Sequence, residues 1–242
     1  MNDRVDAARR CDRLLTFGFN MRFMAAAGAI YQEIQAGGLG RVHHTRCWST
    51  GTTVPGWSVY HRKDKTGGGV LASCAAHAVD LGLWMLGFPQ PDTALASAYH
   101  RIQEDSNMPV TWEGKREDCD VEDLLCGHVT LDEGKSVSVE CIWSGELGDD
   151  IGIEVYGSNG SARLNVASSP SQIYQFAEDG GTIIRPVGPA DWSVSLRQEM
   201  VEFIRCIHEA AEPRVTPEEA IRCQTVIDAL YESTATGRPV SM

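Results

Sequence analysis

The hydrophobic pattern of this sequence changes from a helical period to a period of two near residue 88, and that change constrains the fold more than any other feature. Before it, apolar residues recur at helical spacing, from Phe23 to Ala36 and again from Gly67 to Leu86. After it, apolar and polar residues alternate, which is typical of strands with one wet face. The alternating segments are 93–102, 121–131, 135–144, 151–157, 161–166 and 181–186.

Turn and cap residues define the ends of these elements. Asp132-Glu133-Gly134 and Ser158-Asn159-Gly160 separate alternating segments and predict hairpin turns. Near the C-terminus, Thr216, Pro217 and Glu219 form a capping-box pattern at the start of the second of two final helices. Two strands are also expected earlier, at 14–19 and at 41–50. The pattern predicts an α+β fold in which helices cover one face of a sheet.

Composition excludes several classes of protein. The formal charge of −12 disfavours nucleic acid and anionic membranes as partners. The eight cysteines are scattered without a C-x-x-C pair, so we expect reduced thiols and a cytoplasmic protein. We find neither a signal-peptide pattern nor an apolar run of about 18 residues. No membrane span is therefore predicted.

The run Gly67-Gly68-Gly69-Val70-Leu71-Ala72 matches the form of a dinucleotide fingerprint. A true fingerprint follows an apolar strand, whereas this run follows the charged segment His61–Thr66. We interpret the glycines as allowing the backbone to enter a helix close to a ligand or to another element.

The helix that this run opens carries a polar stripe. Ser73 and His77 are four residues apart, and Asp80 follows three later, so the three side chains share a face. A hydroxyl, an imidazole and a carboxylate on one face can move a proton. The alternative is a structural, hydrogen-bonded histidine.

The sequence predicts no metal site. His43 and His44 are adjacent on an expected strand, so they point to opposite faces. The acidic run Asp118, Asp120, Glu122 and Asp123 is expected to form a solvated edge with at most weak cation binding.

Several motifs, taken in order, resemble the substrate domain of the Gfo/Idh/MocA oxidoreductases. They are Phe19-Asn20-Met21-Arg22-Phe23, Gly37-Gly38-Leu39-Gly40-Arg41-Val42, Gly67-Gly68-Gly69, His77-Ala78-Val79-Asp80-Leu81, Trp84-Met85-Leu86-Gly87, Val121-Glu122-Asp123-Leu124, Tyr156-Gly157-Ser158-Asn159-Gly160-Ser161, Ala229-Leu230-Tyr231-Glu232-Ser233 and Gly237-Arg238-Pro239-Val240. The resemblance implies an open, mixed, mostly antiparallel sheet of the dihydrodipicolinate-reductase-like C-terminal type. It also implies NAD(P)-dependent oxidation or reduction of a sugar, inositol or related polyol.

The resemblance also exposes two departures. Residues 1–22 resemble only the last helix and strand of the family's Rossmann domain, and 23–242 resemble the substrate and oligomerisation domain. The dinucleotide fingerprint is absent, so this chain alone is not expected to bind NAD or NADP or to be active. In addition, Ser73 stands where the family has an aspartate.

From the matched motifs we predict His77 as acid or base, with Ser73 and Asp80 orienting it or the substrate. Substrate-binding candidates are Arg22, Trp57, Lys63 and Lys65. The expected partners are a small polyhydroxylated substrate and further copies of the chain, in a dimer or tetramer formed through the open sheet face. The competing hypothesis is a non-catalytic binding or assembly protein that kept the fold.

Overall fold

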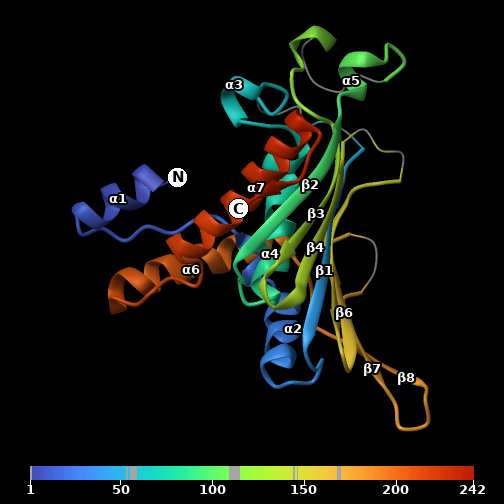
Figure 1. Cartoon of the computed structure of the whole chain (residues 1–242). Coiled ribbons are helices and arrows are strands. Elements are labelled where there is room, and N and C mark those ends of the chain that lie inside the picture. The colour runs from blue at the N-terminus through green and yellow to red at the C-terminus, as the bar shows by residue number, and fades with distance from the viewer. Residues whose placement is uncertain are drawn as a thin grey trace.

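The computed structural model describes residues 2–52, 54, 59–108, 115–143, 145, 147–167 and 170–242. These residues form one nine-stranded sheet with helices against one face (Figure 1). The strands are β1 Val42–Thr50, β2 Pro91–Tyr99, β3 Leu124–Leu131, β4 Lys135–Ile142, β5 Asp150–Gly157, β6 Gly160–Asn165, β7 Gln172–Phe176, β8 Thr182–Pro186 and β9 Val240–Ser241. The helices are α1 Asn2–Arg10, η1 Asn20–Phe23, α2 Ala25–Gln35, α3 Lys63–Thr66, the π-helical turn η2 Leu71–Ala75, α4 Ala76–Met85, α5 Arg101–Glu104, η3 Arg116–Asp118, η4 Asp132–Gly134, α6 Trp192–Glu209 and α7 Pro217–Thr236.

The strand order is β8-β7-β6-β5-β1-β4-β3-β2-β9. β1 and β4 run parallel, and every other neighbouring pair is antiparallel. The expected mixed, mostly antiparallel sheet is confirmed. The parallel pair places the carboxyl ends of β1 and β4 at the same edge of the sheet, which matters for the site.

The helices α2, α4 and α7 pack on one face of this sheet, and no helix of the described residues covers the opposite face (Figure 1). On the covered face, Cys47, Val139 and Ile153 of three adjacent strands are buried. On the open face, Arg46 of β1 pairs with Glu140 of β4 at 3.1 Å and Glu154 of β5 at 3.4 Å. Alternation along each strand therefore separates an apolar core from a polar outer surface.

The predicted capping box and the two predicted hairpin turns are present. The Thr216 hydroxyl accepts a hydrogen bond from the backbone N–H of Glu219, and the Glu219 carboxylate accepts one from the N–H of Thr216, each at 3.3 Å. The turn at Asp132–Gly134 joins the antiparallel pair β3 and β4. The turn at 158–160 joins β5 and β6.

The expected strand at 14–19 does not form. The segment runs extended between α1 and η1, and no strand in the described residues pairs with it (Figure 1). A strand needs a neighbour to satisfy its backbone N–H and C=O groups, and this segment lies away from the sheet. Two strands that the pattern missed, β7 and β9, are also present.

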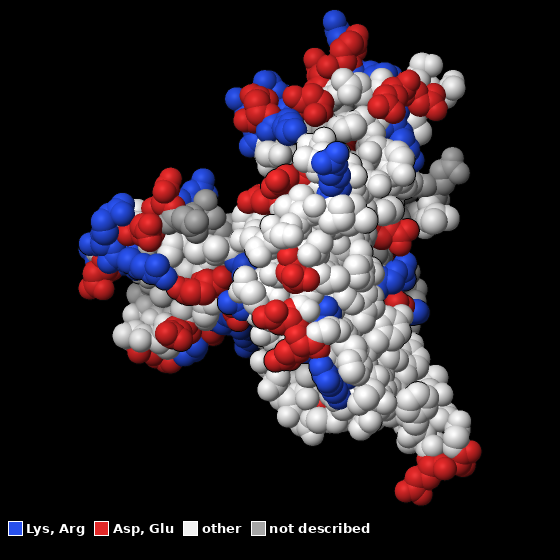
Figure 2. All heavy atoms as spheres, in the orientation of Figure 1, with Lys and Arg blue, Asp and Glu red and all other residues white. Residues whose placement is uncertain are grey.

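Lys63–Met85 has the length and apolar composition of a membrane span, but 67% of its most apolar window is buried inside the domain. That degree of burial is the behaviour of a core helix. All eight cysteines are free thiols. Basic and acidic side chains are intermixed over much of the visible face, with an acidic group at the end of the β7–β8 hairpin (Figure 2).

Candidate functional site

A pocket of about 500 Å³ opens at the edge of the sheet where β1 and β4 end. β5 runs antiparallel to β1, so it begins at this same edge, and the start of α6 adds another wall. Ser73 and His77 reach the pocket from the helix that covers the sheet. The described lining residues are Ser49, Thr50, Gly51, Tyr60, Ser73, Cys74, His77, Trp143, Asp149, Asp150, Ile151, Val166, Ala167 and Trp192.

His77 is held between two aromatic rings. Its imidazole meets Phe19 edge-on with ring centroids 6.2 Å apart and Trp192 with centroids 5.1 Å apart. Its Nδ1 is buried without a hydrogen-bond partner in the structure. Burial lowers the pKa of His77 to about 4, because the surroundings disfavour the charged ring. The imidazole is therefore neutral at neutral pH, and its unprotonated nitrogen can accept a hydrogen bond.

Ser73 lies in the π-helical turn one turn before His77. Its hydroxyl donates a hydrogen bond to the carbonyl of Gly69 at 2.8 Å. The hydroxyl proton is thereby used within the helix, and the oxygen lone pairs remain available to accept from a ligand hydroxyl. Single π-helical turns often occur at functional sites, and this one brings Ser73 and His77 to a common pocket.

Arg22 and Asp80 do not line this pocket. The Arg22 guanidinium donates from Nε and Nη2 to the two carboxylate oxygens of Asp80, at 2.8 and 2.6 Å, and both side chains are fully buried. Arg22 also bonds Glu219 at 2.6 Å. Burial raises the pKa of Asp80 to about 6, against the opposing effect of Arg22. The structure places this pair in the core, so neither Asp80 nor Arg22 reaches the pocket that His77 lines.

Lys63 and Lys65 are also outside the described pocket lining. Lys63 and Lys65 are exposed on α3, and Lys65 pairs with Asp64 at 3.2 Å. Trp57 lies outside the described residues.

The backbone of the glycine run packs against Glu122 and Tyr231 of the same domain. The Glu122 carboxylate accepts hydrogen bonds from the N–H groups of Gly69 at 2.8 Å and Leu71 at 3.1 Å, and from the Tyr231 hydroxyl at 2.8 Å. A Cβ at Gly68 would lie 2.1 Å from the Tyr231 oxygen, and one at Gly69 would lie 2.0 Å from the Glu122 carbonyl. These contacts leave no room for a pyrophosphate, so a dinucleotide does not fit here.

The acidic run is a solvated edge only in its first half: Asp118 and Asp120 are exposed, whereas Glu122 and Asp123 are buried. Glu122 caps the helix as described, and the Asp123 carboxylate accepts from Arg101 Nε and the Ile102 N–H, each at 2.7 Å. Both acids are buried because they satisfy backbone and guanidinium donors. No group of three or more potential metal ligands occurs among the described residues.

Sequence reasoning missed most of the pocket wall, including Tyr60, Trp143, Asp149, Asp150 and Trp192. These residues come from four separate stretches, and the pairing of β1 with both β4 and β5, together with the placement of α6, brings them to one edge. The usual placement of ligands at carboxyl ends of strands would have found them, had that pairing been predicted.

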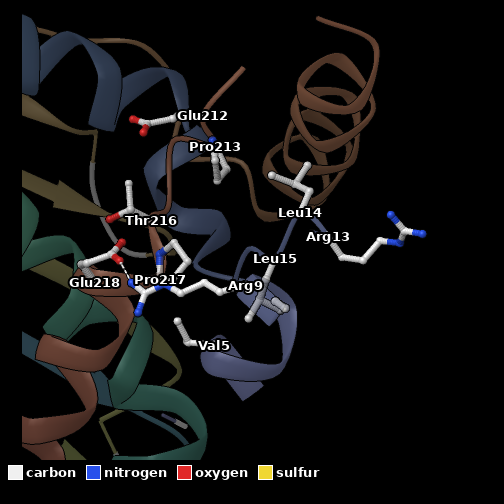
Figure 3. Close-up of a pocket in the computed structure, with 11 residues that line it drawn as sticks. Val5, Arg9, Arg13, Leu14, Leu15, Glu212, Pro213, Thr216, Pro217 and Glu218 are labelled. Carbon is white, nitrogen blue, oxygen red and sulfur yellow. Dashed lines mark hydrogen bonds and ion pairs between the residues drawn. The ribbon is translucent and has the colours of Figure 1, made fainter. Parts of the chain in front are cut away.

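A second hollow of about 240 Å³ lies between α1, the following extended segment and the start of α7 (Figure 3). Val5, Leu14 and Pro217 line it, and Arg9 forms an ion pair with Glu218 across it (Figure 3). It is formed by the attachment of α1 to the domain and holds no histidine or cysteine, so it is a weaker candidate for chemistry.

Comparison with known proteins agrees with this architecture. A family model described as "Oxidoreductase family, C-terminal alpha/beta domain" matches residues 32–242. The chain belongs to the Gfo/Idh/MocA oxidoreductase family. The fold matches an NAD-binding oxidoreductase from Klebsiella pneumoniae with a TM-score of 0.79 and 20% identity, covering 99% of this chain and 69% of that one.

Relatives from this Gfo/Idh/MocA family include sugar dehydrogenases. The chain is 25% identical to D-glucoside 3-dehydrogenase of Escherichia coli, over 98% of this chain and 67% of that protein. It is 28% identical to D-xylose 1-dehydrogenase (NADP(+)) 2 of Haloferax volcanii, over 52% of this chain and 38% of that protein. Levoglucosan dehydrogenase in complex with NADH has the same fold, with a TM-score of 0.77 and 20% identity, covering 94% of this chain and 66% of that one. The chain thus spans about two thirds of the length of the proteins that it matches over nearly its whole length.

Proposed function

We propose that this chain is the substrate domain of an NAD(P)-dependent oxidoreductase that acts on a sugar or related polyol. The observation that carries the proposal is the pocket in which a neutral histidine and a serine face three aromatic side chains and two carboxylates. Aromatic faces stack on the C–H face of a sugar ring, while hydroxyl, imidazole and carboxylate groups bond its hydroxyls. Membership of the Gfo/Idh/MocA family supports the same reading.

His77 would accept the proton of the substrate hydroxyl that is oxidised. Its imidazole is neutral, and the rings of Phe19 and Trp192 fix its plane. Ser73 would accept a hydrogen bond from a neighbouring hydroxyl, because its own proton is committed to Gly69. A serine carries no charge at this position, so it orients the substrate and does not polarise His77 as a carboxylate would.

The dinucleotide would be held by a separate domain, because the glycine run of this chain is closed by Glu122 and Tyr231. One surface is suited to receive that domain. On α6, apolar side chains stand 43–57% exposed, namely Val194, Leu196, Met200, Val201, Ile204 and Ile207. The unpaired segment 14–19 precedes η1, which packs against α6, and it offers backbone groups to a sheet edge.

The open face of the sheet would form the contact between copies of the chain. Tyr156, Phe176 and Ile184 lie on this face and are 43%, 74% and 54% exposed. Apolar side chains on a broad, uncovered sheet are typical of an oligomer interface.

The competing proposal is a non-catalytic binding protein that kept the pocket. Ser73 in place of an aspartate favours it, since the position lacks the charge that the resemblance associates with catalysis. The two proposals share ligand binding and differ in turnover.

A chimaera tests both proposals. The nucleotide-binding domain of the Escherichia coli D-glucoside 3-dehydrogenase is joined ahead of this chain, and reduction of NAD⁺ or NADP⁺ is followed with neutral sugars. We expect turnover with the chimaera and its loss in a His77→Ala chimaera that still binds dinucleotide. Sugar binding to the chain with no turnover by the chimaera would instead support the non-catalytic protein.

A further inference from the structure

The charged side chains that line the pocket are all acidic. Asp149 and Asp150 lie at its rim where β5 begins, and no lysine or arginine is among the described lining residues. The residues outside the described part of the chain contain no lysine or arginine either. A basic residue that approached the pocket would therefore have to come from a described position.

The arginines nearest in sequence to lining residues, Arg46, Arg62 and Arg163, each form an ion pair with an acid outside the pocket lining. Arg22 is enclosed with Asp80 and Glu219. Arg101 bonds Asp123 at 2.7 Å. These cations neutralise acids of the fold and are not offered to a ligand.

The helix N-termini beside the pocket do not take the role of the missing basic side chains, because they are not free to bind an anion. A helix N-terminus usually attracts phosphate through its free N–H groups. At the start of the turn that carries Ser73, the backbone N–H groups donate to the Glu122 carboxylate. At the start of α6, the Asp191 carboxylate accepts a hydrogen bond from the Val194 N–H at 2.9 Å. Carboxylates of the protein thus occupy both positions.

The two aspartates at the rim are held in fixed positions by hydrogen bonds from the protein. One oxygen of Asp149 accepts from the Thr52 N–H at 2.6 Å and the Thr52 hydroxyl at 2.9 Å. Asp150 accepts from Trp48 Nε1 and from the Ala167 N–H, each at 3.2 Å. A carboxylate has about four acceptor sites, so the exposed Asp149 can still bond a donor on a ligand.

We propose that Asp149 and Asp150 make this pocket selective for neutral or amino sugars and against phosphorylated or carboxylated ones. The inference rests on the proposed function, which supplies the sugar as ligand. An anionic group entering the pocket would meet two carboxylates and no lysine or arginine among the described lining residues, whereas a hydroxyl or ammonium group would find acceptors. The selection follows from charge and not from size.

Four ligands of matched shape test this on the intact chain by ligand-detected NMR titration at neutral pH. They are glucose, glucosamine, glucose 6-phosphate and 6-O-acetylglucose, the last being a neutral sugar with bulk at the phosphate position. We expect the phosphate to bind about tenfold more weakly than the acetyl sugar, and glucosamine to bind a few-fold more tightly than glucose. Raising the salt concentration should narrow both differences.

Asp149→Asn removes one charge and keeps an oxygen for Thr52. It should reduce the phosphate discrimination to about threefold. Asp179→Asn makes the same change at the exposed β7–β8 turn, far from the pocket, and should leave the discrimination unchanged. Phosphate binding as tight as that of the acetyl sugar would overturn the inference while leaving the proposed function intact. Failure of all four ligands to bind would overturn the proposed function itself.

Discussion

Arg22 and Asp80 form a two-bond ion pair in which neither side chain has any exposed surface. Three other groups complete its surroundings. Arg22 also bonds Glu219 and the Arg214 carbonyl, and its guanidinium lies 4.8 Å from the Phe88 ring centre. The pair therefore joins η1 and α4 to the start of α7. Its role is to hold the helices that support the pocket.

Removing one partner of this pair should destabilise the domain strongly. Asp80→Ala leaves a buried guanidinium without its main acceptor, and such changes cost about 3–5 kcal/mol. The free energy of unfolding from urea titration measures the loss. The double variant Arg22→Met with Asp80→Leu should recover much of it, because neither charge of the fully buried pair then remains, and the carboxylate of Glu219 is 28% exposed. A loss below about 1 kcal/mol in Asp80→Ala would contradict the assignment of the pair to the core.

Alanine substitutions along the glycine run should lower the stability of the domain by different amounts. A Cβ at Gly69 meets backbone, the Glu122 carbonyl, and cannot be relieved by a side-chain rotation. A Cβ at Gly68 meets the Tyr231 ring, which is held by Glu122 and the Ala72 N–H. Gly67 has open space but a φ of +79°, so alanine there costs only about 1–2 kcal/mol of backbone strain.

We therefore expect stability to fall in the order Gly67→Ala, Gly68→Ala, Gly69→Ala, with Gly69→Ala losing the most. Thermal melts of the three variants at one pH check the order. The interpretation of the run as a ligand-binding loop predicts a different result, in which all three variants melt like the wild type and only binding changes.

The sequence predicted the sheet and its helices because their signals are local. Alternation revealed β2 to β6 and β8, and Thr216 with Glu219 marked the start of α7. The segment 14–19 has the apolar composition of a strand, yet a strand also needs a neighbour, which composition does not report. β7 was missed because the short run 172–176 offers little alternation to detect.

The site was harder to predict because its residues meet through the topology. Ser73 and His77 were found from helical spacing, and they do share the pocket. Asp80 has the same helical spacing, but its carboxylate binds Arg22. These two residues are 58 positions apart in the sequence, so no local pattern could predict their contact. Asp149 and Trp192 required the parallel pairing of β1 with β4 and the placement of α6.

The chain should associate through its open sheet face. Phe176 is 74% exposed on the open face of β7, whereas Ile173, on the opposite face of the same strand, is fully buried. Phe176→Glu should shift the chain from oligomer to monomer in light scattering, because a desolvated charge in an apolar contact costs several kcal/mol. Leu147→Glu is the control, since Leu147 is 96% exposed in the loop before β5 and off the sheet. A wild-type chain that remains a 26.4 kDa monomer at tens of micromolar would refute the prediction.

His77 should make the stability of the domain depend on pH below neutrality. The pKa of a histidine is about 6.5 in the unfolded chain, whereas burial lowers that of His77 to about 4 in the fold. Between these values the unfolded state binds more protons, so stability is complete above pH 6.5 and falls as the pH decreases toward 4. For His77 this loss amounts to about 2 kcal/mol between pH 7.5 and pH 5.

The measurement compares urea unfolding of the wild type and His77→Gln at these two pH values. Glutamine does not titrate, so the variant should lose about 2 kcal/mol less than the wild type on acidification. The exposed His43, changed to Gln, controls for the number of histidines. At pH 7.5 the His77→Gln domain should remain folded while losing sugar binding, because the neutral ring lines the pocket and its Nδ1 has no partner to leave unsatisfied. Equal acid sensitivity in the two proteins, together with unimpaired binding, would make His77 an ordinary surface histidine and remove the proton acceptor from the proposed mechanism.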